Sequence, residues 1–331
     1  MAEHSTPPLL EMRNVGVRLG REANSPALIE NIDLSIWPGE TVGLVGESGS
    51  GKTTLGMALV RLLPNLLEKG LSGQVFYDGR DVLKLGKAEL TQIRGGEISM
   101  ILQDPMASLN PIFTIGNQLR EGLRLNATAA GSLEERAIAA LESVRIPSPK
   151  ARLDNHPHQM SGGMRQRVVG AIALTRAPRL LIADEPTTSL DVTIQYQFLE
   201  LLKDLQKRAG MAMLFITHDF GVVAKMCDRV VVMYAGQIVE QGPVRDIFKR
   251  PRHWYTRALL DSVPTVDYAP DRLPTIPGSP PTVAARPAGC RFDPRCPNAH
   301  AKCRVEMPVL DATGDHAVRC WYPLDRERSA A

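Results

Sequence analysis

The chain has 331 residues, which excludes a disulfide-stapled miniprotein and allows one large domain or two modest ones. Hydrophobic residues make up 44% and charged residues 23%, values typical of a folded globular chain and not of a disordered or collagen-like one. The net charge of +3 gives no overall attraction to nucleic acid or to an anionic membrane surface, so any polyanion site has to be local.

Two composition regimes share the chain. No apolar run of about 18 residues or more occurs, and the N-terminus lacks the pattern of a secretory signal, so we expect a cytosolic protein. A reducing compartment argues against structural disulfides. The five cysteines are then expected to be free thiols, catalytic residues or metal ligands. Four of them lie in the last 42 residues, and 11 of the 25 prolines lie from Pro264 onward. The C-terminal part therefore differs in kind from the rest.

The first regime, to about residue 250, alternates short apolar runs with helix-period segments. Segments 9–20 and 30–40 are typical of antiparallel strands. Buried parallel strands are predicted at 41–46, 97–102, 179–184, 212–217 and 229–234, and helices at 132–144 and 194–209. This order predicts an α/β fold around a mostly parallel central sheet. From Pro264 onward neither period occurs, which predicts a linker or an irregular extension.

A phosphate-binding loop is predicted directly after the strand at 41–46. The segment matches GxxxxGK[ST] and precedes a helical run, so both flanks are those that a phosphate loop requires. Its backbone N–H groups and the following helix N-terminus can face phosphate oxygens, with Lys52 bridging the β- and γ-phosphates and Thr53 on Mg²⁺. The alternative is a glycine-rich turn with no ligand. The predicted ATP-binding residues here are Gly46, Glu47, Ser48, Gly49, Ser50, Gly51, Lys52, Thr53 and Thr54.

A second apolar strand ends in two carboxylates, Asp184 and Glu185. Asp184 suits coordination of Mg²⁺, and Glu185 can orient and polarise the water that attacks the γ-phosphate. Taken alone, an apolar strand that ends in Asp-Glu is a common, solvated strand terminus. The phosphate loop earlier in the chain is what favours the functional interpretation.

Further motifs follow in a characteristic order. Gln103 follows the strand at 97–102, the sequence MSGGMRQR occupies 160–167, Ser189-Leu190-Asp191 follows the acidic strand, and Thr217-His218-Asp219 follows the next strand. In order and spacing these motifs resemble the nucleotide-binding subunit of ABC transporters over residues 9 to 250. The resemblance implies an ABC-type P-loop NTPase with an antiparallel β subdomain and a helical subdomain at about 104–175. We therefore expect the ABC domain at 9–260 and the extension at 261–331.

The resemblance also implies roles for individual residues. Ser161, Gly162 and Gly163 look like the family signature, a helix N-terminus that binds the γ-phosphate of ATP held by a partner subunit. Glu185 would be the catalytic base, and His218 would contact the γ-phosphate and order the attacking water. Gln103 would sense Mg²⁺ and that water, and Asp191 belongs to the loop that crosses the dimer interface. The chain departs from many relatives at Leu19, where they carry an aromatic residue that stacks on adenine.

Narrower motifs resemble one branch of that family, the ATPases of bacterial dipeptide and oligopeptide importers. These motifs are Gln103-Asp104-Pro105 with residues 108–111, DEPTTSLDVTIQ at 184–195 and PRHWYTRALLDSVP at 251–264, in which Trp254 replaces the usual proline. The same branch includes relatives for nickel and for oligosaccharides, so the cargo is not fixed by the motifs. Two permeases would carry the cargo, supplied by a periplasmic solute-binding protein.

The four C-terminal cysteines, Cys290, Cys296, Cys303 and Cys320, are separated by five, six and sixteen residues. Four thiolates can hold zinc or an iron–sulfur cluster. No CxxC pair occurs, and the wider spacing favours a cluster; four unligated cysteines or disulfides formed on oxidation stay as alternatives. The surrounding Pro-rich sequence resembles the C-terminal extension of peptide-importer ATPases, which implies a [4Fe–4S] cluster. Cys227 is interpreted as a buried small apolar residue.

The sequence therefore predicts the ATP-hydrolysing subunit of a peptide ABC importer, with ATP and Mg²⁺ as ligands. The predicted partners are a second ATPase subunit, for which the resemblance favours a paralogue, and two permeases, but no nucleic acid. The predicted location is the cytoplasmic face of the inner membrane, as a peripheral protein. Two rival interpretations are a soluble ABC ATPase of translation or DNA repair and a cassette that is actuated by a metal-sensing tail.

Overall fold

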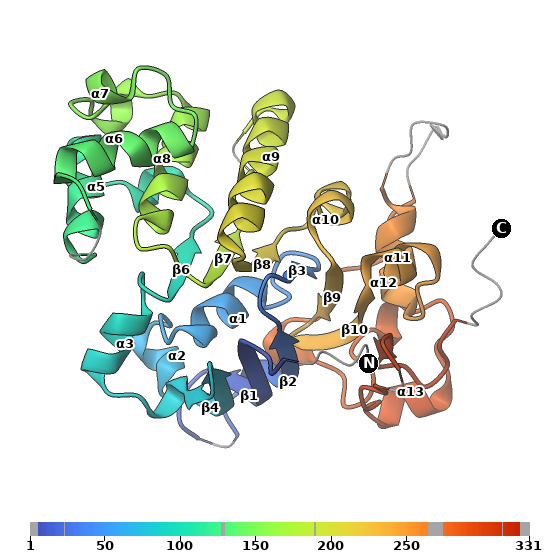
Figure 1. Ribbon diagram of the computed structural model, residues 1–331. Coiled ribbons are helices and arrows are strands. Elements are labelled where there is room, and N and C mark those ends of the chain that lie inside the picture. The colour runs from blue at the N-terminus through green and yellow to red at the C-terminus, as the bar shows by residue number, and fades with distance from the viewer. Residues whose placement is uncertain are drawn as a thin grey trace. The chain divides into compact units, whose positions relative to one another are not determined.

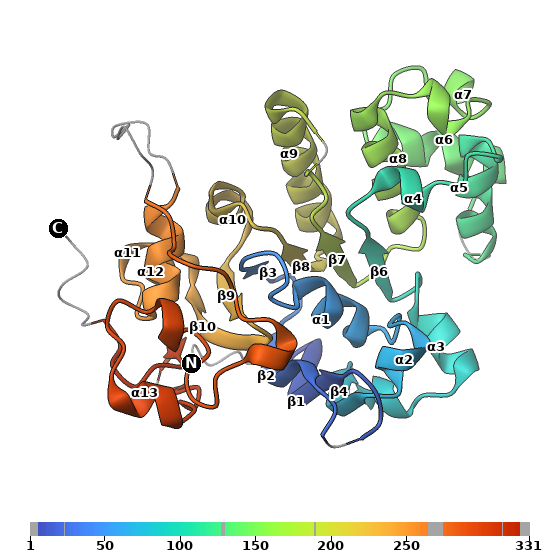
Figure 2. The same ribbon diagram turned by 180° about the vertical axis from the view of Figure 1, so that it is seen from behind.

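The computed structural model describes residues 6–22, 24–126, 130–188, 190–263, 274–312 and 314–324. The chain forms two compact units, one made of residues 1–84 with 215–331 and the other of residues 85–214. The boundary falls within one strand, β8 (Ala212–Ile216). Figure 1 and Figure 2 show the chain from opposite sides.

The first unit contains a four-stranded antiparallel sheet. Its order is β2 (Ala27–Ile36), β1 (Leu10–Arg18), β4 (Leu71–Tyr77) and β5 (Arg80–Asp81). Strand β1 pairs antiparallel with both β2 and β4. Side chains on its inner face, such as Val15 and Val17, are fully buried against Ile29 and Ile32 of β2. The two antiparallel strands predicted near the N-terminus are confirmed.

A second sheet of the first unit carries its core. Strand β3 (Thr41–Val45) runs parallel to β9 (Arg229–Tyr234), which pairs antiparallel with β10 (Gln237–Pro243). Strand β3 is buried along its whole length, as expected for a valine- and leucine-rich strand covered on both faces. Helices of this unit include α1 (Lys52–Leu59), α2 (Asn65–Glu68), α10 (Phe220–Met226), α11 (Val244–Lys249) and α12 (Trp254–Asp261). Cys227, predicted to be buried, is half-buried and packs against this core.

The second unit is mainly helical around two parallel strands, β6 (Ile98–Ile101) and β7 (Leu180–Asp184). Figure 1 shows its helices gathered beside these strands and the long helix α9 (Val192–Ala209) following β7. The others are α3 (Lys87–Ile93), α4 (Pro105–Ser108), α5 (Ile115–Arg124), α6 (Leu133–Ser143), α7 (Pro149–Arg152) and α8 (Gly162–Leu174). Helix α6 begins where predicted because Ser132 and Glu135 form a capping box.

The C-terminal segment is largely irregular, but it carries short elements that the sequence did not predict. These are 3₁₀ turns at Val283–Ala285 and Asp293–Arg295, helix α13 (Ala301–Val305) and strand β11 (Ala317–Val318), which pairs antiparallel with β10. Elements of two to five residues are too short to give a periodic pattern, which explains the difference. Residues 264–273 of the predicted linker lie outside the described residues. Among the helices of the described ranges, none is both long and apolar enough to cross a membrane.

Candidate functional site

The loop between β3 and α1 has a backbone that only glycine adopts without strain at several positions. Gly46, Gly49 and Gly51 have φ angles of 151°, 79° and 102°. A Cβ atom on Gly46 would lie 2.2 Å from the carbonyl oxygen of Met233, and one on Gly51 would lie 2.5 Å from Cγ2 of Ile29. Close contacts exclude a side chain at Gly46 and Gly51, and the positive φ alone favours glycine at Gly49.

Lys52 is the first residue of α1, and its ammonium lies over the loop. Its side chain is buried, and Nζ donates hydrogen bonds to the carbonyl oxygens of Gly46 at 2.7 Å and Glu47 at 3.1 Å. The hydroxyl of Ser50 is buried and has no hydrogen-bond partner. Thr53, by contrast, is exposed at the first turn of α1. A positive charge and an unpaired hydroxyl are thus directed to the loop, which is the chemistry that an anionic ligand requires.

His218 lies in the same unit, directly after β8. The N–H of Thr217 donates to the carbonyl of Leu44 in β3 at 3.1 Å, and Asp219 caps α10 by accepting from Gly221 and Val222. The backbone on both sides of His218 is therefore fixed, while its side chain is exposed.

The second unit brings together two of the predicted catalytic residues. Because β6 and β7 are parallel and Ile101 pairs with Ala183, Gln103 and Glu185 both leave the same end of the strand pair. Gln103 Nε2 donates to Glu185 Oε2 at 3.0 Å, and Thr188 Oγ1 donates to the same oxygen at 2.9 Å. Asp184, the last residue of β7, is buried. The sequence analysis did not predict the role of Thr188. Its position three residues after Glu185, in a tight turn, could have predicted this hydrogen bond.

The predicted signature segment begins a helix, as expected. Ser161 is the N-cap of α8, and its Oγ accepts from the N–H of Met164 at 3.3 Å. Gly162 faces open space, whereas a Cβ on Gly163 would lie 2.5 Å from Cγ2 of Ile194. Asp191 caps α9 by accepting from the N–H of Ile194 at 3.0 Å. Ser189 of the preceding motif lies outside the described residues.

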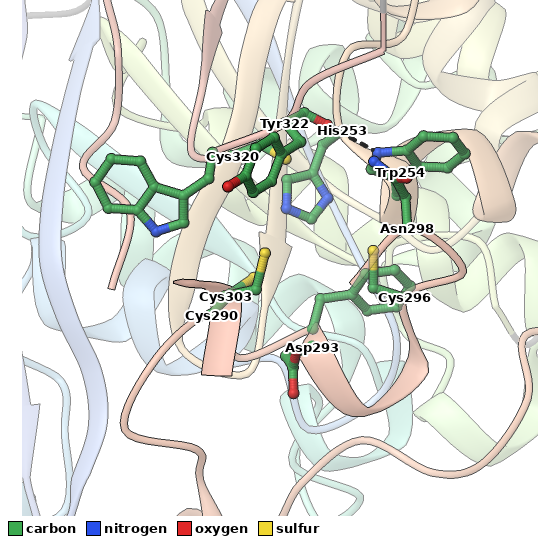
Figure 3. Close-up of a pocket in the computed structure, with 11 residues that line it drawn as sticks. His253, Trp254, Cys290, Asp293, Cys296, Asn298, Cys303, Cys320 and Tyr322 are labelled. Atoms are coloured by element: carbon green, nitrogen blue, oxygen red, sulfur yellow. Dashed lines mark hydrogen bonds between the residues drawn. The ribbon is translucent and has the colours of Figure 1, made fainter. Parts of the chain in front are cut away.

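The four C-terminal cysteines line one small pocket in the first unit, together with His253 and Phe292. Figure 3 shows Cys290, Cys296, Cys303 and Cys320 around this space. Burial raises the pKa of Cys296 to about 11 and that of Cys320 to about 12, and it also raises the pKa of Cys290. Backbone N–H groups act in the opposite direction and favour the thiolates. These N–H groups belong to Phe292 and Asp293 at Cys290, Asn298 at Cys296 and Tyr322 at Cys320.

No three His, Cys, Asp or Glu side chains in the described ranges are arranged to hold a single metal ion. His253 adds a polar group to the pocket wall. Its Nδ1 accepts from the N–H of Tyr255 at 3.0 Å, which leaves the ring proton on Nε2. That nitrogen is buried and forms no hydrogen bond to the residues that the structure describes. Burial accordingly lowers the pKa of His253 to about 4.

Sequence reasoning missed two contacts on the phosphate loop, and both come from the C-terminal part of the chain. The hydroxyl of Tyr255 accepts from the N–H of Glu47 at 2.9 Å. The guanidinium of Arg295 pairs with the Glu47 carboxylate at 2.7 and 3.0 Å. The partners are separated by 208 and 248 residues in the sequence, so no local sequence pattern predicts these contacts.

Comparison with protein families gives two matches along the chain. Residues 29–188 match the family described as "ABC transporter", which covers the phosphate loop, the signature and the Asp-Glu strand. The dimeric ATP-binding cassette MJ0796, solved in a post-hydrolysis state with ADP and Pi, has a TM-score of 0.63 at 28% identity, over 71% of this chain and 99% of that one. CbiO1 from Clostridium perfringens gives 0.62 at 25% identity, over 74% and 92%. The protein is an ABC-type ATPase with the α/β fold of that class.

The second match narrows the class. Residues 239–303 match the family described as "Oligopeptide/dipeptide transporter, C-terminal region". The dipeptide transport ATP-binding protein DppD of Escherichia coli (strain K12) is 44% identical over 96% of this chain and 97% of its own length. A protein of Brucella melitensis named as a peptide import ATP-binding protein is 48% identical over 95% of both. The chain belongs to the ATP-binding proteins of the oligopeptide/dipeptide family of ABC transporters.

Proposed function

We propose that this protein hydrolyses ATP to power the import of peptides across the inner membrane. The observation that carries the proposal is the match of residues 239–303 to the C-terminal region of oligopeptide/dipeptide transporters, because the ATPase core is shared by transporters of many cargoes. The near full-length similarity to DppD supports the same cargo class.

The phosphate loop is proposed to bind the triphosphate of ATP. Lys52 supports this role because its ammonium is already directed over the loop by the Gly46 and Glu47 carbonyls, and a phosphate oxygen can replace them as its partner. The loop N–H groups and the Ser50 hydroxyl add neutral donors. Thr53 and Asp184 offer the oxygen ligands that Mg²⁺ prefers, and bound Mg²⁺ would neutralise charge on the β- and γ-phosphates.

Glu185 is proposed to position the attacking water and to accept its proton. One of its carboxylate oxygens, Oε2, already accepts from Gln103 and Thr188, and these two bonds fix the plane of the carboxylate. Gln103 is proposed to report on the Mg²⁺ site through that bond, and His218 to contact the γ-phosphate. Ser161, Gly162 and Gly163 are proposed to bind the ATP of a partner subunit, with Asp191 in the loop that faces that partner.

The proposed assembly has two ATPase subunits, of which the second is a paralogue, and two permeases that receive peptide from a periplasmic solute-binding protein. A subunit of this kind lies at the cytoplasmic face of the inner membrane as a peripheral protein. Coexpression with permeases encoded nearby, reconstitution into vesicles and measurement of ATP hydrolysis with added solute test the proposal. Stimulation by di- or oligopeptides supports it, whereas stimulation only by nickel or by oligosaccharides overturns the peptide assignment.

We infer that the four cysteines bind a [4Fe–4S] cluster. Their position around one shared pocket supports four ligands to one group, and coordination to iron would deprotonate thiols whose pKa burial raises. Cysteine thiolates are the usual ligands of iron–sulfur clusters, one for each iron of a [4Fe–4S] cluster. Cys290, Cys296, Cys303 and Cys320 would supply the four thiolates that hold the cluster.

Iron and sulfide analysis of protein purified without oxygen tests this inference. Four irons and matching sulfide per chain, in protein with the brown colour of an iron–sulfur cluster, would support it. Stoichiometric zinc in colourless protein overturns it, as does a metal-free protein that folds and hydrolyses ATP normally. If bound, the cluster would anchor a proline-rich segment that has too little core to fold by burial alone.

A further inference from the structure

Glu47 is the residue of the phosphate loop through which the C-terminal extension touches the loop. Arg295 Nη1 donates to Glu47 Oε2 at 2.7 Å, and Nη2 donates to Oε1 at 3.0 Å. This is a bidentate pair, the arrangement in which a guanidinium fixes both the position and the plane of a carboxylate. The Arg295 side chain is 4% exposed and that of Glu47 is 27% exposed, so water screens the pair only partly.

The guanidinium of Arg295 is itself fixed from the extension side. Its Nε donates to the carbonyl of Pro277 at 2.8 Å, and Nη1 also donates to the hydroxyl of Tyr234 at 3.2 Å. Its remaining donors are therefore occupied by groups outside the loop. Arg295 cannot follow Glu47 if the loop moves, so the pair transmits position from the extension to the loop.

The backbone of Glu47 is held at the same place. Its N–H donates to the hydroxyl of Tyr255 in α12, and its carbonyl accepts from Lys52 Nζ at 3.1 Å. The ring of Tyr255 packs against Tyr234 and Phe292, with centroid distances of 4.5 and 5.4 Å. Glu47 thus joins the lysine of the phosphate loop to an aromatic cluster that includes a residue of the extension.

Arg295 belongs to the short turn that carries two of the four cysteines. The N–H of Asp293 donates to the carbonyl of Cys290 at 3.0 Å, and the N–H of Cys296 donates to the carbonyl of Asp293 at 3.2 Å. Phe292, between the same cysteines, lines the cysteine pocket on one side and packs on Tyr234 and Tyr255 on the other. Cys296 directly follows Arg295 in the sequence, and the backbone hydrogen bond between Asp293 and Cys290 ties the other cysteine to the same turn, so a displacement of either cysteine shifts Arg295.

We propose that Arg295 is a positioning residue of the ATP site, which acts through Glu47 to set the conformation of the phosphate loop and thereby the affinity for MgATP. The proposal rests on ATP binding at this loop and does not require metal in the cysteine pocket. It gives the extension a function in the ATPase cycle: the state of the cysteine-bearing turn sets how tightly the nucleotide is bound.

The chain offers a matched control in Arg291, four residues earlier. Its side chain is 6% exposed, and its guanidinium donates to the carboxylate of Glu30 and to the carbonyl of Ala235. Arg291 therefore also ties the extension to the rest of the first unit through a buried guanidinium and a carboxylate, but neither of these partners belongs to the phosphate loop. Loss of Arg291 tests what general loosening of the extension does.

The experiment compares Arg295→Gln, Arg295→Lys and Arg291→Gln in the full-length protein. The measurements are the dissociation constant of a fluorescent ATP analogue, KM and kcat for MgATP, and the melting temperature without nucleotide. We expect Arg295→Gln to raise the dissociation constant and KM about five- to tenfold, since a hydrogen-bonded charge pair is lost, with kcat changed less than about twofold. Arg295→Lys keeps the positive charge but cannot form the bidentate pair, so the increase in KM should be intermediate. Arg291→Gln should lower the melting temperature and leave KM unchanged.

The proposal is overturned if Arg295→Gln folds and binds ATP like the wild type, or if Arg291→Gln raises KM as much. Should Arg295→Gln fail to fold, Glu47→Gln breaks the same pair from the more exposed side and carries the same expectation for KM. In the double variant, the two changes should weaken ATP binding no more than the larger single effect, because they remove one interaction. Iron is measured in every preparation: a KM effect in iron-free protein supports the role of Arg295 while the cluster assignment fails.

Discussion

The phosphate loop and the cysteine-bearing turn are both short and irregular, but they are fixed in different ways. The loop owes its shape to glycines whose positive φ angles and close backbone contacts exclude side chains. The turn owes its position to long side chains, Phe292 and Arg295, that reach partners far away in the sequence. Glycine positions can be recognised from the local sequence, whereas long-range side-chain contacts cannot. The two regions should therefore respond differently to substitution.

The largest effect is expected in the catalytic step, which depends on neither constraint. Glu185→Gln keeps the size of the side chain and its contacts with Gln103 and Thr188 but removes the base. ATP hydrolysis, measured as phosphate release, should fall by about a hundredfold or more, while binding of the ATP analogue is retained. Thr188→Ala, which leaves the carboxylate in place, should cost far less. Normal turnover by Glu185→Gln would show that the base lies elsewhere.

The glycines of the loop provide the next largest effect. Alanine at Gly46 has to displace the carbonyl of Met233, which lies 2.2 Å from the added Cβ, and has to adopt a strained φ. We expect the affinity for the ATP analogue to fall by about tenfold or more, because strain of this kind costs on the order of 1–3 kcal/mol. Gly79→Ala is the control: its φ is 75° and nothing lies within 4 Å of the added Cβ, so stability falls slightly and ATP binding does not. Equal loss of binding in both variants would contradict the steric argument.

The sequence predicted the locally encoded parts well. The strand predicted at 229–234 is β9 residue for residue, because an unbroken run of β-branched residues is buried on both faces. Gln103 and Glu185 were predicted from motifs, and the parallel pairing of β6 and β7 places them in hydrogen-bond contact. The contacts of Glu47 with Tyr255 and Arg295 could not be predicted, because arginines and tyrosines are common and their partner depends on the complete fold.

Cysteine substitutions show whether the cysteine-bearing turn depends on a bound cluster for its stability. Cys296→Ser removes one proposed thiolate, so we expect loss of bound iron and a lower melting temperature, since ligand bonds replace core burial in this segment. Cys227→Ser provides the comparison within the same unit, because Cys227 packs on the core but does not line the pocket of the other four cysteines. Iron content and absorbance should be unchanged there. If Cys296→Ser retains full iron, the assignment of the four ligands is wrong.

The smallest effect is expected when the hydrogen bond to the Glu47 backbone is removed and the ion pair of the Glu47 side chain with Arg295 is kept. Tyr255→Phe keeps the ring that packs on Tyr234 and Phe292 and removes only the oxygen that accepts from the Glu47 N–H. An N–H left without its partner should cost about 1 kcal/mol of stability and raise the KM for MgATP about two- to threefold, less than loss of the Arg295 ion pair. Tyr322→Phe is the matched control, because the hydrogen bond from Trp254 goes to the Tyr322 backbone carbonyl and survives the change. If Tyr255→Phe weakened ATP binding more than Arg295→Gln, the loop would be positioned mainly through its backbone by α12, and the extension would have the lesser part in setting nucleotide affinity.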